Sequence, residues 1–97
     1  MKTLNEAKQI LKKNKPILKS KFGVKEIGIF GSFVHNEARK RSDIDILVEF
    51  SKIPGIFKFM DLEDYLQKVL KTKVDLVRKK ALRVELRDNI LEETVFI

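Results

Sequence analysis

The segment GSFVHNEARKRSDIDILVEF, residues 31–50, contains the pattern that decides the fold. Its second half alternates strictly from Asp43 to Phe50, so that three β-branched residues share one face and the intervening residues share the other. The first set is Ile44, Ile46 and Val48, and the second is Asp43, Asp45 and Leu47. This alternation predicts a β-strand with one face in the core and two carboxylates on the opposite face.

The two carboxylates are placed to bind a cation together. Side chains at positions i and i+2 of a strand point the same way, about 6.6 to 6.8 Å apart along the backbone, so Asp43 and Asp45 can hold one hard divalent cation. The run KVDLV, residues 73–77, predicts another short strand carrying Asp75, which joins the same face if the strands pair. Three clustered carboxylates repel one another and persist best with about two divalent cations between them.

Gly31 and Ser32 precede this strand and have the features of a phosphate-binding turn. They follow a short apolar run, residues 25–30, that predicts a strand, and they open a possible short helix, Ser32 to Asn36. Glycine lets backbone N–H groups approach an anion, serine adds a hydroxyl donor, and a helix N-terminus favours negative charge. Mg²⁺ could link the aspartates to a phosphate bound at Gly31 and Ser32. This ion is commonly held by one or two carboxylates, and substrate phosphates complete its coordination.

The remaining elements predict a single domain, residues 1–97, of α/β or α+β class with helices packed on one sheet. A capping box at Thr3 and Glu6 begins a helix that Gly23 ends, and Pro16 is expected to kink or restart that helix. A second helix is expected from about 57 to 71 and a strand at 74–77. The chain then forms a charged, helical tail ending in the apolar residues 95–97, which either cover the core or belong to a partner interface.

Composition excludes several classes of protein. With no cysteine among 97 residues, disulfide scaffolds and thiolate zinc sites are excluded, and no apolar run is long enough for a membrane span, so we expect a cytoplasmic protein with no membrane partner. The net charge of +7 raises the prospect of nucleic-acid binding. Residues 1–21 hold seven lysines and one acid, however, and these lysines are most simply explained as the solvent-exposed face of an amphipathic helix. His35 and the run Arg39 to Arg41 are interpreted as surface residues of a polar loop, with a triphosphate clamp as the alternative for Arg39 to Arg41. That run and the basic run Arg78 to Lys80 could each attract a phosphate.

Gly31-Ser32, ten residues, then Asp43-Ile44-Asp45 resembles the GS-x10-D-x-D signature of the DNA-polymerase-β-like nucleotidyltransferase superfamily, and Asp75 falls where that superfamily keeps its third carboxylate. The whole string 28–50 is similar to the minimal nucleotidyltransferases, single-domain proteins with a small mixed sheet flanked by helices. The resemblance implies that ATP binds with its triphosphate at Gly31 and Ser32. It also implies that Asp43, Asp45 and Asp75 hold two Mg²⁺ ions, and that Asp75 helps to deprotonate the acceptor.

Many members of that family act with a small helical HEPN protein. The resemblance implies an antitoxin that transfers AMP from ATP to a tyrosine of a HEPN-domain toxin. One departure is that Val34, His35 and Asn36 stand where the family commonly has Ala-Arg-Gly. Two alternatives therefore stay open, an antitoxin that neutralises its partner by binding alone and a small-molecule nucleotidyltransferase of the antibiotic-modifying kind, with nucleic-acid binding through the N-terminal helix as a weaker idea.

Overall fold

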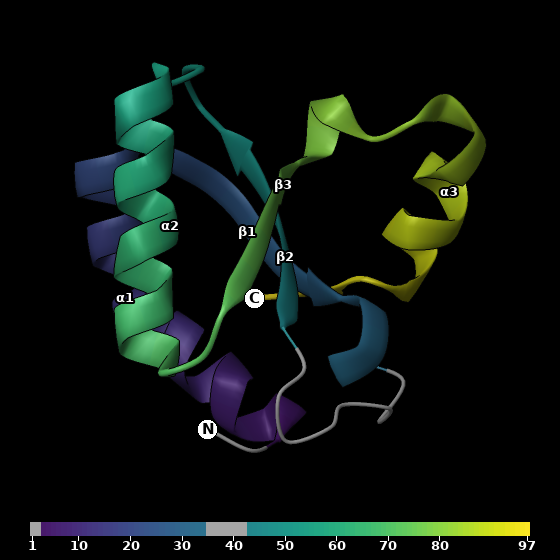
Figure 1. The fold of residues 1–97 in the computed structure, drawn as a ribbon, viewed down its shortest axis with the longest axis horizontal. Helices are drawn as coiled ribbons and strands as arrows, with labels where there is room; N and C mark the ends of the chain where they lie inside the picture. Colours follow the sequence, from purple (N-terminus) through teal and green to yellow (C-terminus); the bar gives the residue numbers. More distant parts are fainter. Residues whose placement is uncertain (1–2, 35–42) are drawn as a thin grey trace.

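The computed structural model describes residues 3–34 and 43–97, which form helices on both sides of a mixed sheet (Figure 1). The elements in chain order are α1 (Leu4–Phe22), β1 (Val24–Phe30), the 3₁₀ helix η1 (Gly31–Phe33), β2 (Ile44–Phe50), α2 (Ile56–Leu70), β3 (Val74–Arg78), the 3₁₀ helix η2 (Lys79–Ala81), α3 (Val84–Glu93) and β4 (Val95–Phe96). The expectations for His35, Asn36 and the run Arg39 to Arg41 fall outside the described residues. No helix in the described ranges is long and apolar enough to cross a membrane.

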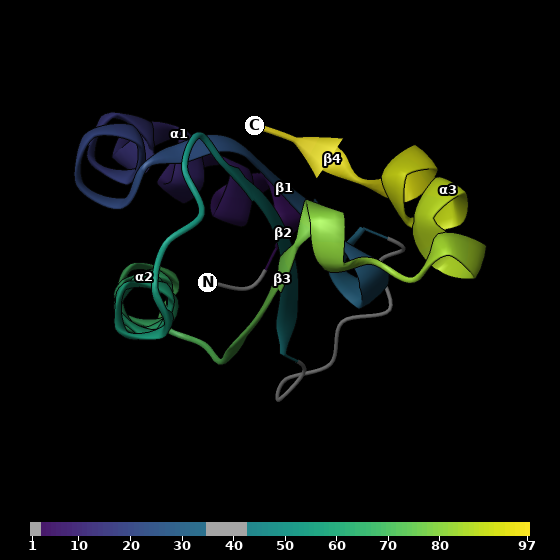
Figure 2. The ribbon, with the colours of Figure 1, turned by 90° about the horizontal axis from the view of Figure 1, so that it is seen from above.

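The sheet has the strand order β3-β2-β1-β4. β1 is antiparallel to both β2 and β4, whereas β2 and β3 are parallel. A parallel pair needs a crossover connection, which α2 provides. Viewed from above, α1 and α2 lie on one side of the sheet and α3 lies on the other (Figure 2). This arrangement confirms the predicted α/β class with a small mixed sheet flanked by helices.

The ends of α1 follow the sequence signals. The hydroxyl of Thr3 accepts the N–H of Glu6 at 3.1 Å, and Gly23 ends the helix in the left-handed conformation with φ 67°. Pro16 lies inside one continuous helix, so the expected restart is wrong. Proline removes a single backbone donor, and buried side chains on both sides of it hold the two halves against the core.

The main core lies between the sheet and the pair α1 and α2. One face of β2 and one face of α2 contribute residues with no exposed surface, namely Ile44, Ile46, Val48, Leu62, Leu66 and Leu70. The alternation predicted for β2 is therefore confirmed. Because these residues point toward the helices, the opposite face of β2 points toward α3 and carries the acidic residues.

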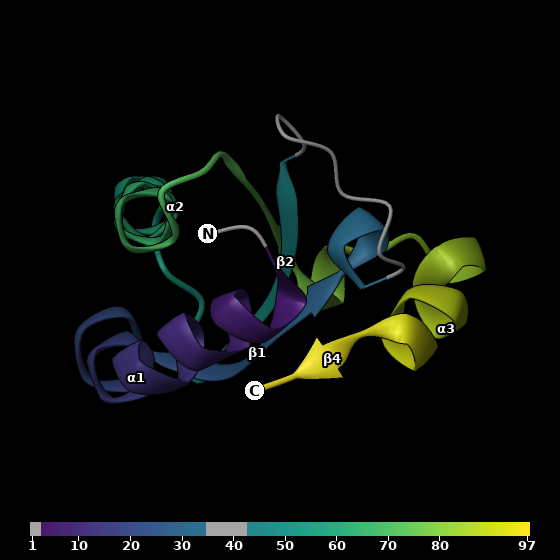
Figure 3. The same cartoon turned by 90° about the horizontal axis from the view of Figure 1, so that it is seen from below.

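β4 is an element that the sequence analysis did not predict. Val95 and Phe96 pair with β1 opposite Ile29 and Gly28, so the chain returns to the sheet after α3 (Figure 3). Gly28 makes this possible, because a Cβ there would lie 2.5 Å from Cγ2 of Thr94 and 3.1 Å from the carbonyl oxygen of Val95. Two residues are too few for a recognisable alternation, and only the tertiary contact reveals the strand.

Candidate functional site

Asp45 and Asp75 lie side by side on the sheet face that points away from α1 and α2. They are direct partners in the parallel register of β2 and β3, as Ile46 and Leu76 are one step further along. Asp45 is half-buried and Asp75 is exposed. The expectation that Asp75 reaches the same face as Asp45 therefore holds in the structure.

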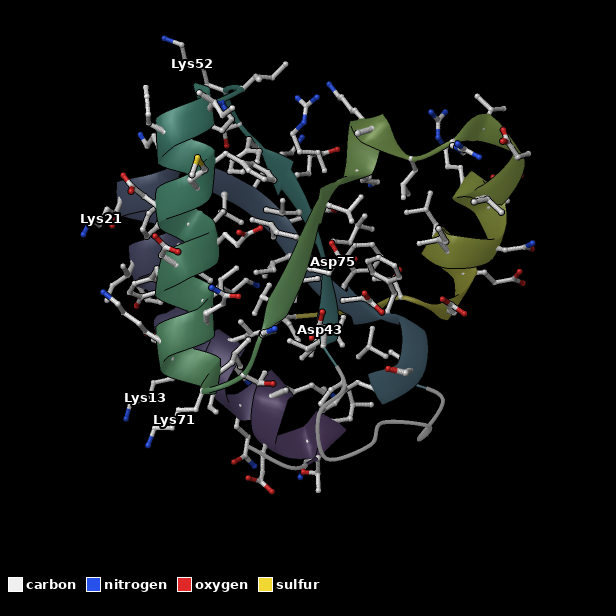
Figure 4. All side chains as sticks on the ribbon, in the orientation of Figure 1. Lys13, Lys21, Asp43, Lys52, Lys71 and Asp75 are labelled. Atoms are coloured by element: carbon white, nitrogen blue, oxygen red, sulfur yellow. The ribbon has the colours of Figure 1, made fainter. Side chains whose placement is uncertain are left out.

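Asp43 is the third member of the group. It directly precedes β2, is exposed, and is near enough for its charge to act on Asp45. Figure 4 shows Asp43 and Asp75 near the middle of the molecule, whereas Lys13, Lys21 and Lys71 lie at the side formed by α1 and α2. The labelled lysines thus lie apart from the carboxylates and do not neutralise them.

Simultaneous ionisation of the carboxylates in this group is electrostatically unfavourable. The pKa of Asp45 is raised from 3.8 to about 6, chiefly by burial and then by the charge of Asp75, a hydrogen bond with Asp75 and the charges of Asp43 and Glu93. Carboxylates placed this close favour either a proton or a cation among them.

Gly31 lies directly against the Asp45 carboxylate. The end of β1 pairs Phe30 with Asp45, and the chain then turns at Gly31 with φ 76°, where a Cβ would collide with the Asp45 carboxylate. Only glycine allows this approach and this backbone conformation without strain. Ser32 follows in η1. The predicted helix from Ser32 to Asn36 extends beyond the described residues; within them, Gly31–Phe33 form a 3₁₀ helix, and the N–H of Val34 donates to the carbonyl oxygen of Gly31 at 3.0 Å.

A fourth carboxylate, Glu93, reaches the same place from the end of α3. The backbone N–H of Gly31 donates to Oε1 of Glu93 at 3.3 Å, across 62 residues of sequence. Glu93 is half-buried, and its charge is one of those that raise the pKa of Asp45. Sequence reasoning missed it, since the neighbouring Glu92 and Glu93 look alike and only the return of the chain through β4 separates their environments.

Lys79, within the basic run Arg78 to Lys80, contacts acidic residues of the sheet. Its Nζ lies 3.2 Å from Oε2 of Glu26 and 3.9 Å from Oε2 of Glu49, and it sits 5.8 Å from the ring centroid of Phe96. Lys79 is thus part of an ion-pair cluster with Glu26 and Glu49, and the attraction of a phosphate by this basic run stays a prediction.

The carboxylates of Asp43, Asp45 and Asp75 are the candidate ligands for a metal ion. Within residues 3–34 and 43–97, no group of three or more acidic or histidine side chains is arranged so that it could hold a metal ion as it stands. The chemistry of the group nevertheless fits a divalent cation. Asp45 and Asp75 are adjacent carboxylates whose mutual repulsion and burial are relieved when a cation lies between them.

Comparison with known proteins gives consistent matches over most of the chain. The sequence pattern of the nucleotidyltransferase domain matches residues 11–97. The protein adenylyltransferase MntA of Thermococcus cleftensis is 46% identical over 97 residues, covering all of this chain and 98% of that protein. A relative in Methanocaldococcus jannaschii, provisionally named a protein adenylyltransferase, is 50% identical over 98 residues and covers both chains fully.

Solved structures agree on the fold. A protein provisionally described as a minimal nucleotidyltransferase superposes with a TM-score of 0.74 at 28% identity, covering 94% of this chain and 88% of its own. A toxin–antitoxin structure with AMP-PNP gives a TM-score of 0.68 at 24% identity, covering 95% and 69%. A tri-AMPylated Shewanella oneidensis HEPN toxin in complex with its MNT antitoxin gives 0.59 at 23% identity, covering 95% and 66%. The last two similarities concern the fold alone.

Proposed function

Because the chain belongs to the nucleotidyltransferase domain family and is an enzyme of that family, we propose that it is a Mg²⁺-dependent protein adenylyltransferase. The acceptor is a tyrosine of a HEPN-domain toxin, and the enzyme acts as the antitoxin. The observation that carries this proposal is the pairing of Asp45 with Asp75 in register, with Asp45 directly beside Gly31. It supports a site in which a nucleotide phosphate and a hard cation meet.

Each residue of the site has a distinct role in the proposal. Gly31 and Ser32 bind the triphosphate of ATP through the backbone and the hydroxyl, because a glycine turn brings N–H donors close to an anion. Asp43, Asp45 and Asp75 would hold two Mg²⁺ ions. Bound there, the ions would neutralise the phosphates and stabilise the charge on the attacking and leaving oxygens. The half-buried position of Asp45 then places negative charge where a cation is needed, whereas the exposed Asp75 faces the acceptor.

The reaction is a displacement at the α-phosphorus of ATP. The oxygen of the acceptor tyrosine forms a bond to that phosphorus, while the bond between the phosphorus and the α,β-bridging oxygen breaks and pyrophosphate leaves. The proton of the tyrosine hydroxyl passes to the Asp75 carboxylate, which can release it to water because it is exposed. The chain's own contribution is positioning and electrostatics, as expected for phosphoryl-type transfer.

The partner is supported by the names of similar proteins. A relative that matches the whole of this chain is named the protein adenylyltransferase MntA, and a structure of similar fold contains a tri-AMPylated HEPN toxin with its antitoxin. These names describe those proteins. They make a HEPN protein the first acceptor to test.

The test is transfer of label from α-labelled ATP to the cognate HEPN protein in the presence of Mg²⁺. The wild type should label its partner, and the double variant Asp43→Asn/Asp45→Asn should not. A matched control is Asp61→Asn/Asp64→Asn, which removes two exposed carboxylates from α2 on the other side of the sheet. Equal labelling by the first double variant and the wild type would contradict the proposal, as would absence of labelling by the wild type.

Two alternatives make different predictions in the same experiment. An antitoxin that acts by binding alone would still neutralise the HEPN partner after both carboxylates are replaced. A small-molecule nucleotidyltransferase would label an aminoglycoside when no protein partner is present. Growth rescue and labelling of each acceptor therefore distinguish the three functions.

A further inference from the structure

We propose that Glu93 is a further residue that determines nucleotide affinity, because its carboxylate competes with the triphosphate for the backbone N–H of Gly31. This inference rests on the proposed function, since it requires that a phosphate is the ligand of Gly31. Glu93 is not one of the three aspartates of the family signature. It reaches the site from the end of α3 rather than from the sheet.

Glu93 and a phosphate compete because Gly31 has only one backbone N–H to donate. The N–H of Gly31 donates to Oε1 of Glu93 at 3.3 Å, and one backbone N–H supplies one strong hydrogen bond. A phosphate oxygen can take this donor only if the glutamate oxygen leaves it. Glu93 thus satisfies the donor when no nucleotide is present and must give it up when the triphosphate binds.

The charge of Glu93 acts in the same direction as the competition. Glu93 is near enough to Asp45 for its charge to raise the pKa of that carboxyl, so it adds negative charge to a site that must accept an anion. Removing this charge lowers the repulsion met by ATP without removing any of the three aspartates. Glu93 therefore weakens nucleotide binding twice, by occupying the donor and by its charge.

The backbone of Glu93 is held in place by its neighbours. The N–H of Thr94 donates to the carbonyl oxygens of Ile90 and Leu91 at 3.0 and 3.3 Å, and Val95 pairs with Ile29 in the sheet (Figure 3). Because β4 fixes the chain on one side and α3 fixes it on the other, release of Gly31 is a rotation of the Glu93 side chain. The backbone does not have to move.

Calorimetric titration with ATP and Mg²⁺ tests the proposal in the full chain. Glu93→Gln keeps the size of the side chain and removes the charge, and Glu93→Ala removes both the charge and the acceptor. We expect ATP to bind on the order of tenfold more tightly to both variants, with Ala at least as effective as Gln. Adenosine, which has no phosphate, should compete for the site equally well in the wild type and the variants. The matched control is Glu92→Gln, an exposed neighbour on the same helix, which should bind ATP as the wild type does.

Several results would overturn the inference. One such result is unchanged or weaker ATP binding by Glu93→Gln in a protein whose circular dichroism is that of the wild type. It would show that Glu93 supports the turn at Gly31 rather than competing with ATP. If adenosine affinity rises as much as ATP affinity, or if Glu92→Gln raises ATP affinity equally, the effect does not come from competition between Glu93 and the triphosphate. If the wild type itself fails to bind ATP, the proposed function falls and this inference falls with it. ATP binding that is present but insensitive to position 93 overturns the inference alone.

Discussion

Replacing Asp45 by asparagine should stabilise the protein at neutral pH when divalent cations are absent. The pKa of Asp45 is raised from 3.8 to about 6 in the folded state, so the folded protein binds this proton more tightly than the unfolded chain does. The stability associated with that proton is fully present below about pH 3.8 and is lost as the pH rises through about 6. Asparagine resembles the protonated acid in shape and carries no charge to be repelled.

The magnitude follows from the size of the shift. About two pKa units at 1.36 kcal/mol each correspond to roughly 3 kcal/mol for a fully buried group. Asp45 is only half-buried, and solvent screening reduces this to about 1.5 kcal/mol. For a domain of this size, such a difference raises the melting temperature by roughly 5 to 10 °C.

The assay is urea and thermal unfolding followed by circular dichroism, in EDTA, at pH 4, 5, 6 and 7.5. Other carboxylates also titrate in this range, so the measured quantity is the difference in unfolding free energy between Asp45→Asn and the wild type. This difference should be about 1.5 kcal/mol at pH 7.5 and should approach zero at pH 4. Asp64→Asn, which removes an exposed carboxylate from α2, should stay within about 0.5 kcal/mol of the wild type. Added Mg²⁺ should cancel the advantage of the asparagine by stabilising the wild type alone. A variant that is less stable than the wild type at pH 7.5, or a difference that does not change with pH, would refute the electrostatic reasoning.

Three other substitutions probe the same arrangement. Asp75→Asn should lower AMP transfer to the partner about 10²- to 10⁴-fold, measured with labelled ATP, because it removes the proposed proton acceptor; transfer at the wild-type rate would contradict that role. Gly31→Ala should destabilise the fold by about 1 to 2 kcal/mol and abolish ATP binding in a titration, since its Cβ meets the Asp45 carboxylate at φ 76°, whereas Gly55→Ala, with open space around it, should do neither. Gly28→Ala should cost about 1 to 3 kcal/mol in urea unfolding by pressing on Thr94, and adding Thr94→Ser should recover part of the loss; no recovery would place the strain elsewhere.

Local patterns in the sequence were sufficient for the parts of the site that depend on one strand and one turn. The alternation around Asp43 and Asp45 predicts both the strand and the face that carries the carboxylates, because a side-chain period of two leaves no freedom once one face is buried. Asp75 needed one further assumption, that β2 and β3 pair, and the parallel register confirms it. Gly31 was predicted as part of a phosphate-binding turn because it follows a strand; the structure confirms the turn, and the phosphate-binding role stays a prediction.

Contacts between distant segments could not be predicted in this way. Glu93 and Gly31 are 62 positions apart, and nothing in a pair of adjacent glutamates indicates which one turns toward the sheet. The answer depends on β4, whose two residues carry no periodic signal and whose position depends on the missing side chain of Gly28. The packing of the whole chain, and not a local preference, therefore brings the fourth carboxylate to the site.

The exposure of the carboxylates also bears on the kind of acceptor that the proposed enzyme uses. A small acceptor is commonly held in a cavity that covers about 70 to 90% of its surface. Asp43 and Asp75 are exposed, and only Asp45, on the side of Gly31, is half-buried, so the described residues enclose the nucleotide side of the site more than the acceptor side. An acceptor that is not enclosed must be positioned by contacts elsewhere, and a folded protein partner can supply them through its own surface. Among the described residues, the exposure of Asp43 and Asp75 thus favours a protein acceptor over an aminoglycoside in the proposed reaction.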